Sequence, residues 1–138
     1  MDKERPYSQA LERLRNAGLR PTRQRLALAK LLFDGLDRHV TAEILHGEAL
    51  EANVRVSLAT VYNTLHQFNE AGLLREIVVD SGRSYFDTNT SDHHHIFNED
   101  SRELMDIEAD QIGLTGLPAI EAGQELSRVD VIVRVKNN

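Results

Sequence analysis

The apolar pattern of the chain changes near residue 73, and this change constrains the fold more than any other feature. Before it, helical spacing predicts helices over 8–17, over 23–34, from Thr41 onward and over 58–71. After it, β-rich segments cover 75–87, 93–97 and 103–107. Helices followed by a hairpin predict an α+β chain whose first part is a helix-turn-helix core with a wing.

Cap and turn residues mark the predicted boundaries. Ser8, Thr22, Thr41 and Ser57 are expected N-caps, and Gly18 and Gly72 follow the ends of the first and fourth helices. Helical spacing turns a set of apolar side chains inward: Leu26, Leu28, Ala29, Leu32, Phe33, Ile44, Leu45, Leu50, Leu58, Val61, Leu65 and Phe68. The turn Asp80-Ser81-Gly82 joins the two hairpin strands.

The second half of the chain is predicted as a separate small domain. The polar stretch from Thr88 to Asp92 has the composition of a linker, which divides the chain into 1–88 and 89–138. A short helix is expected near 118–125, followed by a strand over 127–136. In this strand four valines alternate along one face (129, 131, 133 and 135), which favours pairing within a dimer interface.

Composition and charge exclude several classes of protein. The chain has no cysteine, which excludes disulfides, thiolate zinc sites and a cysteine nucleophile. No apolar run reaches the roughly 20 residues of a membrane helix, and the first residues lack the apolar core of a signal peptide, so we expect a cytoplasmic protein with no membrane partner. The net charge is −6, yet residues 1–30 hold eight basic and three acidic side chains. This basic start indicates either an anionic partner or a solvated helix surface.

The fourth predicted helix has a polar face suited to DNA. That face carries Ala59, Thr60, Asn63, Thr64 and Gln67, with Tyr62 at its margin. Threonine and alanine can contact thymine methyl groups, while asparagine and glutamine can read adenine in the major groove. Arg20, Arg23 and Arg25 cluster near the start of the second helix, where guanidinium groups can hold phosphate or enter a narrow minor groove. The alternative for both sets is an ordinary solvent-facing surface.

Histidines and carboxylates crowd residues 87–95. On a strand, His93 and His95 point to the same face with α-carbons roughly 6.8 Å apart, a spacing at which two imidazoles can chelate one metal, while His94 points to the other face. Asp87, Asp92, His39 and Asp106 are further candidates. These nitrogen and oxygen ligands suit Mn(II), Fe(II) or Zn(II), although three consecutive histidines can also form an accidental surface tract. His46 and His66 are expected at the surface or the core edge.

Several segments of the chain resemble the ferric uptake regulator (Fur) family of bacterial metal-responsive repressors. They are LRPTRQRLALAKLL, HVTAEIL, VSLATVYNTLHQFNEAGLL, and FDTNTSDHHHIF running into ELMDI. The resemblance implies a winged helix-turn-helix DNA-binding domain over 1–88 and a small α/β dimerisation and sensing domain over 89–138. It implies a non-enzymatic homodimer that binds AT-rich palindromic double-stranded DNA. The expected DNA-binding residues are Arg20, Arg23, Arg25, Ser57, Ala59, Thr60, Tyr62 and Asn63.

The resemblance also implies a regulatory metal site that draws ligands from both domains. Its expected members are His39, Asp87, His93, His95 and Asp106, and bound Mn(II) or Fe(II) would favour the DNA-competent shape. The chain departs from the family pattern where most members bind structural zinc, because Asn98 and Ser101 replace the first cysteine pair and the second pair has no counterpart. No structural zinc is therefore expected. An accessory site with Asp92 and His94 would lack further ligands.

The missing cysteines and the histidine run resemble one subgroup, the iron response regulators, which sense iron through haem. The resemblance implies a haem site at His93, His94 and His95, where haem would compete with the metal and release DNA. A peroxide- or metal-sensing repressor without a haem response is the alternative within the same fold. A metalloenzyme with a mononuclear His/Asp centre and a haem carrier or metal buffer are the alternatives from other classes.

Overall fold

The computed structural model describes residues 7–80 and 82–138. The chain forms two compact units, of which the first ends at Thr90 and the second begins at Ser91. Each unit is described by itself. Within the described residues, no helix has the length and apolar character needed to cross a bilayer.

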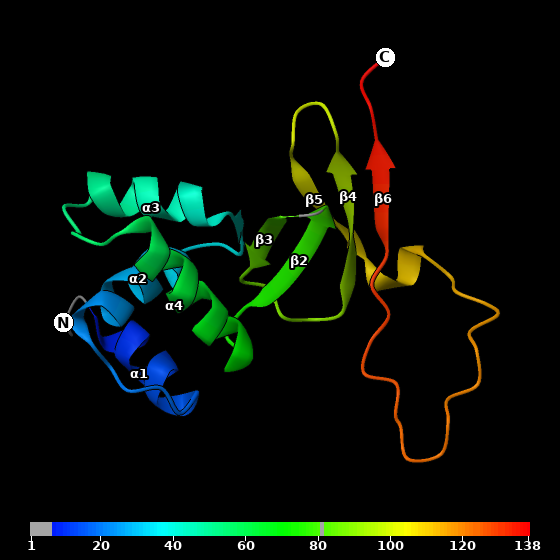
Figure 1. The fold of residues 1–138 in the computed structure, drawn as a ribbon, viewed down its shortest axis with the longest axis horizontal. Coiled ribbons are helices and arrows are strands. Elements are labelled where there is room, and N and C mark those ends of the chain that lie inside the picture. The colour runs from blue at the N-terminus through cyan, green and yellow to red at the C-terminus, as the bar shows by residue number, and fades with distance from the viewer. Residues whose placement is uncertain (1–6, 81) are drawn as a thin grey trace, which may run out of the picture. The chain divides into compact units, whose positions relative to one another are not determined.

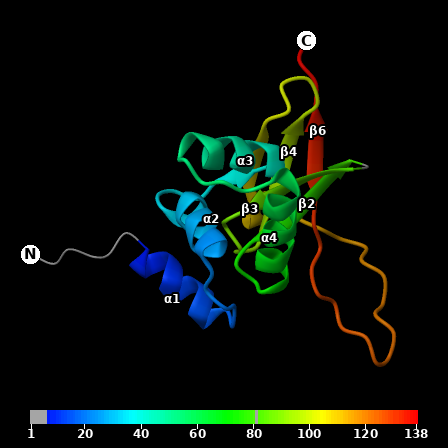
Figure 2. The same ribbon diagram turned by 60° about the vertical axis from the view of Figure 1, so that its left-hand side comes forward.

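The first unit is a winged helix-turn-helix domain. Its elements are α1 (Ser8–Asn16), α2 (Arg23–Phe33), β1 (His39–Val40), α3 (Ala42–Glu51), α4 (Leu58–Glu70), β2 (Arg75–Asp80) and β3 (Arg83–Asp87). Helix α2 packs against α1 and α3, and α3 packs against α4 (Figures 1 and 2). Buried side chains from all four helices, β1 and β3 form one apolar core, which fixes α4 on the domain.

Three of the four predicted N-caps are confirmed. The hydroxyl of Thr22 accepts a hydrogen bond from the Arg25 backbone N–H at 3.2 Å. Thr41 and Ser57 accept in the same way from residues three positions further along α3 and α4, both at 3.1 Å. The prediction for Ser8 is wrong, because Tyr7 is the N-cap of α1 and makes no side-chain cap bond. Short polar side chains thus begin the last three helices of this unit, α2, α3 and α4.

The buried faces of α3 and α4 differ from the predicted ones. Ile44 and Leu50 are 46% and 55% exposed, whereas Ala42, Leu45 and Ala49 are buried. The two alanines are small enough for neighbouring helices to approach closely, so the packed face of α3 follows 42-45-49. In α4, Val61, Leu65 and Phe68 are buried as predicted, but Leu58 is exposed and the polar Thr64 is buried.

The wing is a hairpin to which a third short strand adds. Strands β2 and β3 pair antiparallel, as predicted, and Ser81 of their turn lies outside the described residues. Strand β1 pairs with the other edge of β3, which gives the order β1-β3-β2. Sequence patterning missed β1 because two residues carry no periodicity. Its pairing places His39 directly opposite Asp87.

The second unit is a three-stranded sheet formed by β4 (His93–Asn98), β5 (Leu104–Glu108) and β6 (Ile132–Val135). Strand β4 lies in the centre, antiparallel to β5 and parallel to β6 (Figure 1). A 3-10 turn, η1 (Ala109–Gln111), follows β5. The helix predicted near 118–125 is wrong, since this stretch is irregular and Gly116 and Gly123 have φ of 76° and 87°. Strand β6 is shorter than predicted, and its pairing in a dimer stays a prediction.

Asn98 ties the turn between β4 and β5 to the end of the chain. Its side-chain oxygen accepts hydrogen bonds from the N–H groups of Asp100 at 2.9 Å and Ser101 at 3.0 Å. Its amide nitrogen donates to Oδ1 of Asn137 at 2.9 Å, and the Asn137 N–H donates to Oδ2 of Asp100 at 2.7 Å. These hydrogen bonds therefore stabilise the turn that contains Asn98 and Ser101. By the family resemblance, most relatives carry a zinc-binding cysteine pair at these two positions.

Replacing Asn98 with alanine should destabilise the second unit. The variant loses three hydrogen bonds, and for partly exposed groups we expect a loss of about 1–2 kcal/mol in the free energy of unfolding. The Ser101→Ala variant is the matched control, because its hydroxyl accepts only one long bond of 3.4 Å, from the Glu103 N–H. Urea denaturation followed by circular dichroism measures both. Equal losses in the two variants would contradict this role of Asn98.

Candidate metal ligands and nucleic-acid interface

His39, which is partly buried, and Asp87, which is fully buried, form a pair in the first unit. They face each other across β1 and β3, with 3.1 Å between His39 Nε2 and Asp87 Oδ2. The Asp87 side chain is 1% exposed, and its second oxygen accepts a hydrogen bond from the Asn89 N–H at 2.9 Å. Two backbone-anchored strands therefore hold one imidazole and one carboxylate in a fixed orientation.

Arg38 and Thr88 lock the chain on either side of this pair. The Arg38 N–H donates to the Thr88 hydroxyl at 2.8 Å, and the Thr88 N–H donates to the Arg38 carbonyl at 3.0 Å. The Arg38 guanidinium also pairs with Glu48 on α3, with 2.9 Å between Nη1 and Oε1. This arrangement connects β1 and the end of β3 to α3.

The second unit holds two imidazoles and a carboxylate. His95 lies directly opposite Asp106 in the β4–β5 ladder. The Nε2 atoms of His93 and His95 lie 3.3 Å and 3.4 Å from the same Asp106 oxygen, Oδ1. Both imidazoles are at least 96% buried, whereas the Asp106 side chain is 40% exposed. The predicted common face of His93 and His95 is therefore present, and Asp106 joins it.

The hydrogen bonding of this cluster fits a cation. His93 Nδ1 lies 2.6 Å from the Ser91 carbonyl oxygen, which can only accept, so Nδ1 carries the proton. In a neutral imidazole Nε2 then has a lone pair, and this lone pair faces a carboxylate oxygen. A positive charge between His93 Nε2 and Asp106 Oδ1 satisfies both atoms, and either a metal ion or a proton can supply it. Metal bonds of about 2.1 Å separate neighbouring ligand atoms by roughly 3.0–3.4 Å, which matches the spacings in both units.

His94 has a different role from its two neighbours. Its Nδ1 accepts a hydrogen bond from the Val131 N–H at 3.2 Å, which fastens the chain just before β6 to β4. Because Nδ1 accepts, Nε2 carries the proton of the neutral ring, so binding a metal through Nε2 would break this bond. The structure thus separates His94 from the pair formed by His93 and His95.

Four of the predicted DNA-binding residues line one hollow between α2 and α4. Its volume is about 430 Å³. The predicted members are Arg20, Arg25, Thr60 and Asn63, and the further members are Thr22, Gln24, Thr64 and Gln67. The set is polar throughout and includes two arginines, as a surface for nucleic acid requires. None of these four further members was in the predicted DNA-binding set, although the predicted polar face of the fourth helix includes Thr64 and Gln67.

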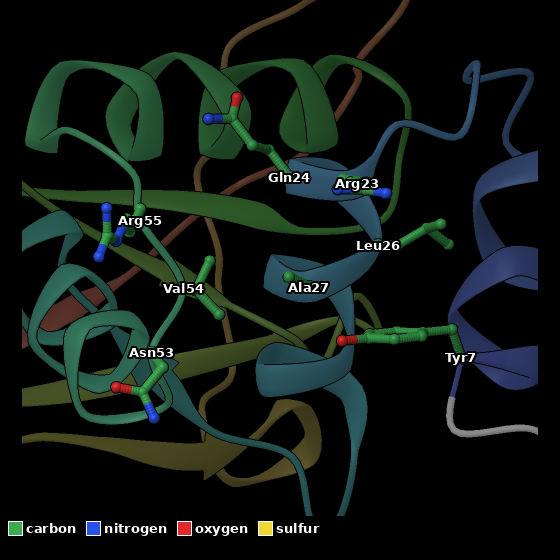
Figure 3. Close-up of a pocket in the computed structure, with 8 residues that line it drawn as sticks. All are labelled: Tyr7, Arg23, Gln24, Leu26, Ala27, Asn53, Val54 and Arg55. Atoms are coloured by element: carbon green, nitrogen blue, oxygen red, sulfur yellow. The ribbon is translucent and has the colours of Figure 1, made fainter.

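The other predicted DNA-binding residues are not among those that line this hollow. Arg23 lines a second cavity of about 630 Å³, which Arg55 of the α3–α4 loop also lines (Figure 3). Ala59 and Tyr62 are exposed, and Ser57 caps α4. The Tyr62 ring packs on His66, with 4.6 Å between ring centroids, and His66 meets Phe86 edge-on at 5.5 Å. His66 is half-buried, which agrees with the expected edge position, and it supports the ring that borders the polar face.

Comparison with known proteins decides the family. The model of the ferric uptake regulator family matches residues 16–133. The chain belongs to the ferric uptake regulator family. It is 39% identical over 99 residues to the peroxide operon regulator of Bacillus subtilis, covering 71% of this chain and 67% of that protein. It is 31% identical over 109 residues to the peroxide-responsive repressor PerR of Staphylococcus aureus, covering 79% and 73%.

Solved structures agree with this assignment. The ferric uptake regulator from Pseudomonas aeruginosa with manganese has a TM-score of 0.69 at 27% identity, covering 93% of this chain and 97% of that chain. The Vibrio cholerae ferric uptake regulator has a TM-score of 0.71 at 24% identity, covering 91% and 98%, and shows the same fold. Fur-family proteins are metal-responsive transcription regulators that bind DNA as dimers, and they are not enzymes. The His/Asp clusters and the polar hollow are candidates for these two tasks.

Proposed function

We propose that this Fur-family chain is a repressor that binds AT-rich palindromic DNA as a homodimer when it holds Mn(II) or Fe(II). The five proposed ligands are His39, Asp87, His93, His95 and Asp106. The observation that carries the proposal is the pair of clusters in which ligand atoms face each other at 3.1–3.4 Å. The proposed DNA-binding residues are Arg20, Arg23, Arg25, Ser57, Ala59, Thr60, Tyr62 and Asn63.

The donor set favours borderline divalent ions. It has nitrogen and carboxylate oxygen but no sulfur, which suits Mn(II), Fe(II) and Zn(II). A bound ion would supply positive charge between the facing ligand atoms. Within the chain, the Asn89 N–H anchors the Asp87 carboxylate, and Arg38 connects the neighbouring β1 to α3 through Glu48. Preference of the ion for one arrangement of the ligands is what shifts the DNA-binding equilibrium.

We further propose that haem counteracts the metal, as the resemblance to iron response regulators implies. The candidate residues are His93, His94 and His95, whose imidazoles suit haem iron as axial ligands. Their side chains are buried, so haem needs local opening of the second unit to reach a ring nitrogen. Because His93 and His95 cannot serve both groups at once, haem binding and metal binding should exclude each other.

One titration tests the proposed function. Fluorescence anisotropy of a labelled AT-rich palindromic duplex is measured at fixed salt with chelator, with Mn(II), and with Mn(II) plus haemin, because affinity for DNA depends on salt. We expect tight binding only with Mn(II) and release by haemin. Absence of binding in every condition would contradict the proposed operator class. Unbiased selection of DNA targets then separates a wrong operator from a wrong function.

The haem assignment has its own prediction. Replacing His93, His94 and His95 with alanine should abolish the haemin-induced shift of the Soret band, because no imidazole of the cluster is left. The control is His46→Ala, which removes a histidine whose Nε2 bonds the Val56 carbonyl in the first unit. An unchanged Soret shift in the triple variant would show that haem binds elsewhere.

A peroxide-sensing repressor without a haem response is the second candidate. It is favoured by two similar relatives, both of which are named peroxide regulators. It uses the same five ligands but Fe(II) in place of Mn(II), with peroxide oxidising a ligand histidine. Mass spectrometry after Fe(II) and peroxide treatment would then find an added oxygen on a ligand-histidine peptide. We expect no such change with Mn(II).

A further inference from the structure

Two hydrogen bonds hold the Arg25 guanidinium between the α1–α2 connection and α4. Nη1 donates to the Arg20 carbonyl at 2.8 Å, and Nη2 donates to Oε1 of Gln67 at 2.9 Å. A guanidinium has donors and no acceptor, so the Gln67 atom that faces it must be the amide oxygen. The amide of Gln67 is thus held with its oxygen toward Arg25.

Gln67 belongs to the polar face that the proposed function assigns to DNA. It lines the same hollow as Thr60 and Asn63, and the spacing 60-63-67 keeps the three on one side of α4. Its side chain is exposed, whereas Arg25 is half-buried behind it. The Gln67 amide is therefore accessible to a ligand, and its hydrogen bond to Arg25 fixes its orientation.

The orientation of this amide determines what it can read. A glutamine that selects adenine accepts from the N6 amino group and donates to N7, so it needs both its oxygen and its nitrogen. Guanine presents acceptors at both N7 and O6. The hydrogen bond to Arg25 turns the amide edge that carries the oxygen and one N–H toward that guanidinium, which leaves the other N–H for the base.

We propose that Arg25 makes Gln67 a single-donor reader, whose remaining N–H contacts N7 of a purine and therefore accepts adenine and guanine alike. This inference rests on the proposed function, since it requires α4 to enter the major groove. Arg25 is the positioning residue and Gln67 the contacting one. Two of the five guanidinium N–H donors of Arg25 serve this arrangement, and the others stay available for phosphate.

The test is selection of binding sites from randomised duplex DNA by the full chain with Mn(II). Wild-type protein should recover adenine and guanine within about three-fold of each other at one position of each half-site, because N7 is common to both. Arg25→Met frees the Gln67 oxygen, so the preference for adenine there should rise about five-fold or more. Arg25→Lys keeps a cationic donor and should retain the wild-type profile.

Two further variants separate base reading from charge and folding. Arg23→Met removes a neighbouring arginine that does not bond Gln67, and it should weaken binding to all sequences without changing base preference. Gln67→Met should lose the purine preference at that position. Replacing the purine there by its 7-deaza analogue should weaken wild-type binding and leave Gln67→Met unchanged.

Identical base preferences in Arg25→Met and wild type would overturn the proposal, even if affinity falls. A strict requirement for adenine by the wild type would overturn it too. Failure of the proposed function gives a different result, because no sequence is then enriched by any variant.

Discussion

Replacing Asp106 with alanine should remove most of the dependence of DNA binding on Mn(II). Asp106 Oδ1 faces both His93 and His95, and replacing Asp106 takes away a negative charge of that cluster. A coupling between two binding sites is typically worth 5- to 150-fold in affinity, so we expect DNA affinity with Mn(II) to fall by about that factor. Affinity with chelator should stay unchanged. Fluorescence anisotropy with chelator and with Mn(II) measures both values.

Asp106 is a better position for this test than Asp87. Its side chain is 40% exposed, so its removal leaves little cavity, whereas Asp87 is 1% exposed and anchors the Asn89 backbone. The matched control is Asp110→Ala, which removes an exposed carboxylate of the 3-10 turn in the same unit. If Asp106→Ala keeps the full Mn(II) effect, the cluster of the second unit is not part of the regulatory site.

Local chemistry explains which parts of the fold the sequence could predict. The N-caps Thr22, Thr41 and Ser57 bond backbone groups three positions further along the chain. Side chains of a strand such as β4 alternate with a period of two residues. Both features can therefore be predicted from short segments. Strand β1 is different, because its existence depends on pairing with β3, 46 or more positions away. The wrongly predicted helix at 118–125 shows the converse, since these residues are exposed and Gly123, with a positive φ, interrupts the stretch.

The candidate site also has features that the sequence could predict and features that it could not. Ligand types and the common face of His93 and His95 follow from residue identity and strand geometry, and the set of five follows from the family resemblance. The bond from Val131 to His94 was not predictable, because it joins residues 37 positions apart. The same holds for Arg25 and Gln67, 42 positions apart. Sequence patterning placed both on polar surfaces, but only the tertiary structure shows that one orients the other.

Arg75 is the clearest buried residue that the sequence could not place. It was expected only as the first residue of the hairpin, yet it is 4% exposed and lies opposite Asp87 in the β2–β3 ladder. Strand β1 places His39 on the other side of Asp87. The buried Asp87 therefore lies between the strand that carries His39 and the strand that carries Arg75. Arginine is almost never fully buried unless it is paired, so the residue type gave no reason to expect position 75 inside.

Replacing Phe68 with alanine should have the largest effect on stability of any substitution in α4. Phe68 is fully buried and packs on Phe33, with 6.3 Å between ring centroids. Loss of a buried phenylalanine ring costs about 3–5 kcal/mol, a large part of the roughly 5–15 kcal/mol that stabilises a typical domain. Urea denaturation followed by circular dichroism measures the loss. Tyr62→Ala on the same helix is the control and should cost far less, because Tyr62 is 43% exposed.

The same variant tests whether the core positions the recognition surface. Phe68 follows Gln67 directly but points into the core, so a cavity there loosens the helix that carries the whole polar face. At temperatures where Phe68→Ala remains folded, its affinity for DNA should fall in the presence of Mn(II), and added metal should not restore it. Phe68→Leu keeps most of the volume and should recover much of both properties. If Phe68→Ala instead binds DNA as tightly as wild type, the polar face of α4 does not depend on this core, and its placement must come from the Ser57 cap and the Arg25–Gln67 bond.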